Sequence, residues 1–177
     1  MSISKLDDLE KINLITQARL ITLLGLAFLI PFYFNMQWFA GPVVNAILII
    51  ILFLSGRMTA FAAAFIPSLS AIAGGLLPPI MLPFVPLIIT GNIFFITVID
   101  HIYNKNKDGF QGYWQGLAAG SWVKFIFLFV AIHLLGPLFV KNELLLKIIN
   151  AFSWPQLISA LGGGVIAWVF LKWLKRF

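Results

Sequence analysis

One lysine lies deep inside an apolar stretch of the sequence. Lys124 stands in the run Ser121-Trp-Val-Lys-Phe-Ile-Phe127, where an ammonium is costly if the stretch crosses a membrane. At about 1.5 Å of rise per helical residue, the nearest acid, Asp100, should lie well below it, and Glu143 lies in an outer connection. Three solutions are open: Lys124 bonds to carbonyl groups at a broken helix, it loses its proton, or an anionic group of a ligand pairs with it.

Four amide side chains accompany this lysine at similar predicted depth. Asn45 and Asn92 lie within apolar segments, Gln37 precedes the segment of Asn45, and Gln156 begins the last segment. Each buried amide needs hydrogen-bond partners, and an amide that both donates and accepts suits recognition of a heterocycle or a peptide-like group. Hydrogen bonding between helices is the alternative for any one of them. Together with Lys124 they predict a pocket for a small solute.

The sequence contains no recognisable machinery for catalysis. It has no cysteine, no paired carboxylates inside the apolar segments, no His-Glu-x-x-His motif and no glycine-rich phosphate-binding loop. His101 and His133 are single residues at opposite ends of different segments, which favours interfacial positions over metal binding or acid-base chemistry. We therefore expect a binding protein without catalytic residues, metal or cofactor.

The elements that must position these residues are membrane-spanning helices. Of the 177 residues, 61% are hydrophobic and 10% charged, and a water-soluble domain of this length could not bury so much apolar surface. The chain is thus predicted to be an all-α membrane protein, a single domain of residues 1–177 folded as a compact bundle of six transmembrane helices. The expected spans are approximately 15–34, 42–54, 59–77, 80–103, 114–139 and 148–174. The second is short for a full span, so it is expected to be tilted or surrounded by protein.

Charge and proline patterns orient this bundle. If the N-terminus is cytoplasmic, eight basic residues gather on the inner side, against Lys141 and Lys147 on the outer side: Lys5, Lys11, Arg57, Lys105, Lys107, Lys172, Lys175 and Arg176. The positive-inside rule then predicts that both termini are cytoplasmic. The net charge is +6, but the basic residues are scattered at the ends of apolar segments and form no patch, which argues against binding to nucleic acid. Most prolines fall toward the outer ends of the segments, where they interrupt regular helix. Lipid tolerates such irregular backbone only where protein or a water-filled cavity surrounds it, so we expect a cavity in the outer half.

Aromatic residues mark the first outer connection, residues 35–41. Trp38 and Phe39, with Phe34 just before it, could form a lid over the pocket. An aromatic belt at the membrane interface is the ordinary alternative.

Small residues mark one face of the first segment. Ala18, Thr22 and Gly25 are spaced by four and three residues, so they share a helix face that another helix can approach closely. An isolated six-helix protein has no evident need for such a face, and a partner subunit is one explanation.

Several stretches together resemble the substrate-binding subunits, or S components, of energy-coupling factor transporters. They are Asn35-Met-Gln-Trp-Phe-Ala-Gly-Pro-Val-Val-Asn45, Leu77-Pro-Pro-x3-Pro83-x2-Pro86-x4-Gly91-Asn92, Lys124, and Pro155-Gln-x3-Ala160-x-Gly-Gly163. The resemblance covers nearly the whole chain. It implies six helices with cytoplasmic termini in the plasma membrane of a prokaryote, and an outward-facing pocket that captures a vitamin or similar micronutrient.

The resemblance also implies partners for transport. The loop between the first two helices would act as a gate, and a separate transmembrane coupling subunit with two cytoplasmic ATPases would power import. In that family an Ala-x3-Ala face on the first helix meets the coupling subunit, whereas this sequence has Ala18-x3-Thr22.

Two other classes of function remain open. A stand-alone secondary transporter would usually show an inverted repeat or a membrane carboxylate for ion coupling, and neither is evident in the sequence. A membrane assembly factor or scaffold would need no pocket, so a bound small molecule separates it from the other two classes.

Overall fold

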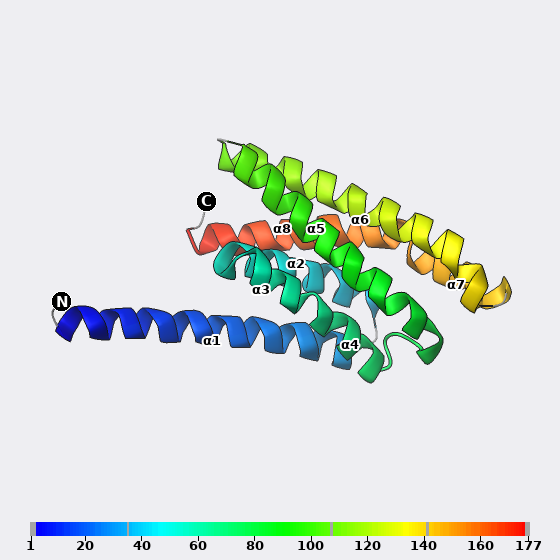
Figure 1. Cartoon of the computed structure of the whole chain (residues 1–177), viewed down its shortest axis with the longest axis horizontal. Coiled ribbons are helices and arrows are strands. Elements are labelled where there is room, and N and C mark those ends of the chain that lie inside the picture. Colours follow the sequence, from blue (N-terminus) through cyan, green and yellow to red (C-terminus); the bar gives the residue numbers. More distant parts are fainter. Residues whose placement is uncertain (1–2, 35, 107, 141, 176–177) are drawn as a thin grey trace.

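The protein folds as a bundle of helices (Figure 1). The computed structural model describes residues 3–34, 36–106, 108–140 and 142–175, apart from the side chains of residues 3–13, 16, 37 and 142–144. The elements are α1 (Ile3–Tyr33), α2 (Gln37–Ser55), α3 (Arg57–Ala63), α4 (Phe65–Ala73), the 3-10 helix η1 (Pro79–Phe84), α5 (Val85–Lys105), α6 (Gly109–Phe139), α7 (Asn142–Ala151) and α8 (Trp154–Trp173). No strand occurs among the described residues, and the prediction of a helical bundle is confirmed.

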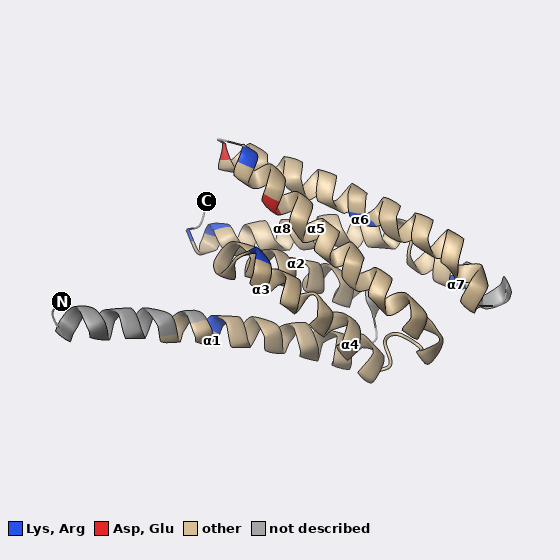
Figure 2. Cartoon of the chain, in the orientation of Figure 1, with Lys and Arg blue, Asp and Glu red and all other residues tan. Residues whose placement is uncertain are grey.

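Four helical stretches are long and apolar enough to cross a membrane. They are Trp38–Ser55, Pro79–Lys105, Gly109–Phe139 and Leu145–Trp173, and two shorter apolar helices cover Gln17–Tyr33 and Arg57–Ala73. These six stretches follow the six predicted segments. Charged residues are few along all of them (Figure 2).

Two pairs of helices form the centre of the bundle: α5 packs along α6, and α2 packs along α8. Helix α1 lies on one side, against α4 and α2. The start of α1 and the end of α8 lie at the same end of the molecule (Figure 1).

Glycine allows close contact between helices, as Gly120 and Gly163 illustrate. A Cβ atom on Gly120 of α6 would lie 3.0 Å from the carbonyl oxygen of Phe95 in α5, and one on Gly163 of α8 would lie 2.6 Å from the carbonyl oxygen of Pro42 in α2. Without side chains at these points, the backbones approach closely, as small residues allow in membrane bundles. The second contact holds the Asn45 region of α2 against α8.

Buried apolar side chains form two clusters. The larger lies among α1, α2, α3, α5, α6 and α8 and includes Leu48, Phe95 and Leu117. The smaller joins η1, α6 and α7 and includes Phe84 and Leu128. Along α6, Lys124 falls between Leu117 of the first cluster and Leu128 of the second.

The helix boundaries differ from the predicted segments where prolines occur. Helix α2 begins at Gln37 instead of residue 42 and has 19 residues, so the expectation of a short second helix is wrong. Pro42 lies early in that helix, where its missing N–H removes one hydrogen bond without ending the helix. The predicted connection 35–41 is correspondingly shorter, because residues 37–41 are helical.

The third and sixth segments are each divided. Residues 59–77 contain the end of α3 and all of α4, which meet at Ala64, and the helix stops at Ala73. Pro67 explains the break, because it has no N–H for the carbonyl group of Ala63, the last residue of α3. Residues 148–174 are interrupted between α7 and α8, just before Pro155 in the first turn of α8.

Candidate functional site

A cavity of about 240 Å³ lies between the helices at the end of the bundle opposite the termini. Its walls come from the end of α1, the start of α2, helix α4 and the turn after it, η1, α5, α6, and the junction of α7 with α8. The lining residues are Pro31, Ala40, Gly41, Val44, Asn45, Pro67, Ser68, Ala71, Leu76, Leu77, Pro78, Met81, Ile88, Asn92, Lys124, Ala151, Phe152, Gln156 and Ser159. The cavity thus forms where prolines interrupt the helices, as the sequence predicts.

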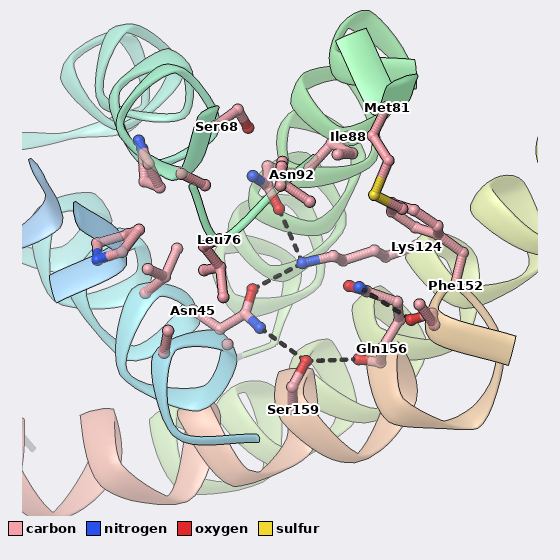
Figure 3. A pocket seen from close by; sticks show the side chains of 18 of the residues that line it. Asn45, Ser68, Leu76, Met81, Ile88, Asn92, Lys124, Phe152, Gln156 and Ser159 are labelled. Atoms are coloured by element: carbon pink, nitrogen blue, oxygen red, sulfur yellow. Dashed lines mark hydrogen bonds between the residues drawn. The ribbon is translucent and has the colours of Figure 1, made fainter. Parts of the chain in front are cut away.

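Lys124 extends from α6 between two asparagine side chains (Figure 3). Its Nζ atom donates hydrogen bonds to Oδ1 of Asn45 in α2, at 2.7 Å, and to Oδ1 of Asn92 in α5, at 2.8 Å. Nζ also lies 5.4 Å from the centre of the Phe95 ring, within the range of a cation–π contact. One ammonium therefore connects three helices.

Hydrogen bonds extend from Asn45 to the start of α8. Its Nδ2 atom donates to Oγ of Ser159 at 3.3 Å, and that hydroxyl donates to the carbonyl oxygen of Gln156 at 3.1 Å. The Gln156 amide in turn donates to the carbonyl oxygen of Ala151, at the end of α7, at 3.5 Å. These contacts orient Asn45 so that its oxygen, and not its nitrogen, faces Lys124 (Figure 3).

The charge of Lys124 faces neutral groups only. Its side chain is 3% exposed, and Asn45 and Asn92 are 2% and 4% exposed. No Asp or Glu is among the described residues that line the cavity. The ion pair between Arg57 and Asp100, at 3.5 Å, lies away from the cavity and partly in solvent. Amide dipoles stabilise an ammonium but do not neutralise it, so a protonated Lys124 has no counter-charge among the described residues that line the cavity.

One polar side chain in the cavity wall, Ser68, lacks a hydrogen-bond partner among the described residues. Ser68 of α4 is 3% exposed, and its hydroxyl has no hydrogen-bond partner among the described residues. Buried hydroxyl groups normally find partners. Ser68 thus lines the cavity with a hydroxyl oxygen that is enclosed and has no partner among the described residues.

The structure brings together four of the five residues predicted to form the pocket: Asn45, Asn92, Lys124 and Gln156 all line the cavity. The side chain of Gln37 lies outside the described residues. The acceptors of the Lys124 hydrogen bonds are side-chain amide oxygens, not the backbone carbonyls of a broken helix considered from sequence.

The predicted lid residues occupy the first turn of α2 instead of a loop. Trp38 is 63% exposed and Phe39 is 48% exposed, and the ring of Phe39 lies 5.2 Å from that of Phe34. Neither lines the cavity. Their role as a lid stays a prediction.

The predicted partner face on α1 is accessible. Ala18 and Thr22 are exposed, and a Cβ atom added to Gly25 would meet nothing within 4 Å. Thr22 bonds back to the carbonyl oxygen of Ala18 at 2.9 Å, so its hydroxyl does not project as a free polar group.

Sequence reasoning missed Ser68, Ser159 and Phe95 as parts of the site. Ser159 follows Gln156 by three residues and so shares its helix face, which was a usable signal. Ser68 stands immediately after a proline that breaks a helix, but as a small residue it fitted a packing role equally well. No sequence pattern singled out Phe95 among 18 phenylalanines.

Comparison of the chain with family models, with curated proteins and with solved structures finds no match. The class of protein is accordingly defined by the fold and the site: an apolar helical bundle with a cavity built around one buried lysine and two asparagines.

Proposed function

We propose that the chain is a membrane-embedded subunit that binds a small anionic solute next to Lys124 and serves as the S component of an energy-coupling factor importer. The substrate is a vitamin or similar micronutrient. The observation that carries the proposal is a buried lysine that lines a cavity and has only neutral hydrogen-bond partners among the described residues.

A purely structural role explains this arrangement poorly. Burying an ammonium carries a desolvation cost of several kcal/mol, and packed apolar side chains of similar volume often give equal or greater stability. A lysine, two amides and an adjoining cavity make better sense if an anion completes the site. The amides hold the ammonium in position and the anion supplies the missing charge.

Helix length and charge support the proposed membrane topology. Four helical stretches have the length and apolarity to span a bilayer, and the positive-inside rule favours cytoplasmic termini. The cavity lies at the end of the bundle opposite the termini. In that orientation it collects solute from outside the cell.

Coupling to a partner is supported by the exposed small-residue face of α1, formed by Ala18, Thr22 and Gly25. A helix face of small side chains allows a helix of another subunit to pack closely against it. We assign this face to the transmembrane coupling subunit, which links the solute-binding subunit to two ATPases.

The test compares the exchange Lys124→Met with Lys147→Met, which removes an exposed lysine of α7. Each protein is purified in mild detergent, and native mass spectrometry measures the small molecule that remains bound. We expect wild type and Lys147→Met to carry the same compound, and Lys124→Met to carry at least tenfold less. Circular dichroism and gel filtration check that each variant is folded.

Two results contradict the proposal. If folded Lys124→Met protein carries as much of the compound as wild type, Lys124 is not part of the binding site. If wild-type protein carries no small molecule, even after incubation with a cell extract, the proposed binding function is wrong.

A further inference from the structure

We propose that the compound bound in the cavity is a small monocarboxylate without a phosphate group, and that the Ser68 hydroxyl is its second hydrogen-bonding partner. The inference rests on the proposed binding function of the cavity. It is carried by the number of charges in the wall, by the size and apolarity of the cavity, and by the unused hydroxyl of Ser68.

The number of charges limits the ligand to one negative charge. Lys124 is the only Lys, Arg, Asp or Glu among the described residues that line the cavity. A carboxylate matches it one to one and forms a charge-assisted hydrogen bond. A phosphate monoester carries about −1.5 to −2 charges near pH 7, and its second charge would be buried without a partner. A ligand with a positive charge would be repelled.

The cavity volume limits the ligand to a small body. About 240 Å³ lies below the roughly 300–1,000 Å³ of pockets for drug-sized ligands. A single ring or a short branched chain fits this space, and a dinucleotide does not. Apart from the polar side chains, the wall is apolar and includes Val44, Leu77, Met81 and Ile88. The body of the ligand is therefore mostly apolar.

Ser68 provides a second fixed point on the opposite wall of the site. It belongs to α4, whereas Lys124 belongs to α6, and both line the same cavity (Figure 3). The Ser159 hydroxyl is already engaged with Asn45 and Gln156. The Ser68 oxygen is enclosed and has no described partner, so rotation of this small side chain toward the cavity breaks no existing hydrogen bond and lets the ligand supply one that burial demands.

The chain offers a matched control for Ser68. Ser121 is also buried and also lacks a hydrogen-bond partner among the described residues, but it does not line the cavity. The exchanges Ser68→Ala and Ser121→Ala thus remove the same group from the same degree of burial. Only Ser68→Ala changes a residue that lines the cavity.

The experiment begins with the compound extracted from purified wild-type protein. Its exact mass and phosphorus content are measured, and methylation counts its carboxyl groups. We expect one carboxyl group and no phosphorus. A phosphate group, a second acidic group, a positive charge or the absence of any acid overturns the inference while leaving the cavity a binding site. If the protein carries no compound at all, the proposed function fails together with the inference.

The extracted compound is then added back to ligand-free wild type, Ser68→Ala and Ser121→Ala, and binding is followed by isothermal titration. Loss of one neutral hydrogen bond should weaken binding about five- to tenfold in Ser68→Ala. Ser121→Ala should bind as wild type does. Equal affinities of the two variants overturn the assignment of Ser68.

Discussion

The contact of α2 with α8 at Gly163 permits a test of how the cavity is held in shape. A Cβ atom on Gly163 would lie 2.6 Å from Cβ of Asn45, 2.6 Å from the carbonyl oxygen of Pro42 and 2.9 Å from the amide nitrogen of Ala46. Two of these atoms are backbone, so no side-chain rotation relieves the overlap. The neighbouring Gly162 is different, because its nearest contact would be Cβ of Pro42 at 3.8 Å, an ordinary van der Waals distance.

These distances set the expected magnitudes for Gly163→Ala and Gly162→Ala. Alanine favours a helix over glycine by about 1 kcal/mol at either position. At Gly163 this gain is outweighed by overpacking, which typically costs about 1–3 kcal/mol, and α2 must move by roughly 1 Å to restore normal contact. That movement displaces Asn45 relative to Lys124 and disturbs their hydrogen bond, which is 2.7 Å long.

We therefore expect Gly163→Ala to lower the free energy of unfolding by up to about 2 kcal/mol and to weaken binding of the compound carried by wild type about tenfold. Gly162→Ala should be neutral or more stable by up to about 1 kcal/mol and should bind normally. Denaturant titration in detergent measures the first quantity and isothermal titration the second. Indistinguishable behaviour of the two variants would refute the claim that close backbone contact at Gly163 positions Asn45.

Two further predictions concern topology and coupling. Cysteines placed at Asn106 and at the C-terminus should be protected from impermeant thiol reagents in intact cells, whereas one at Asn142 should be labelled; the reverse pattern would put the cavity on the cytoplasmic side. Replacing Ala18 and Thr22 together with Leu should abolish uptake by blocking the coupling subunit sterically, while the isolated subunit still binds its ligand. Uptake that persists in this double variant, or transport by wild type alone in liposomes without ATPases, would favour a secondary transporter.

The polar core of the site could be predicted from sequence because polar residues are conspicuous in apolar segments. Lys124, Asn45 and Asn92 each interrupt a hydrophobic run, and the cost of burying each of them alone favours mutual contact. Their pairing geometry could not be predicted, because it depends on how α2, α5 and α6 are rotated. That rotation is set by tertiary contacts such as the one at Gly163.

Helix boundaries were harder to predict because prolines act differently by position. Pro42 lies in the second turn of α2 and does not end it, whereas Pro67 separates α3 from α4. Both residues lack an N–H, and only the surrounding packing decides whether the helix continues. Ser68 was missed because it follows Ala60 and Ala64 at intervals of four residues, and such a pattern of small residues suits helix packing as well as binding.

The way in which Lys124 is held also bears on which acceptors a ligand must offer. Because Asn45 and Asn92 already accept hydrogen bonds from the ammonium, a neutral carbonyl group would add little to its environment. A carboxylate contributes a full opposite charge, and a charge-assisted hydrogen bond is roughly twice as strong as a neutral one. A carboxylate on Asn45 or Asn92 itself would neutralise the ammonium permanently and remove this advantage. In the proposed site, the two amides thus fix the position of the cation and leave its charge to pair with the ligand.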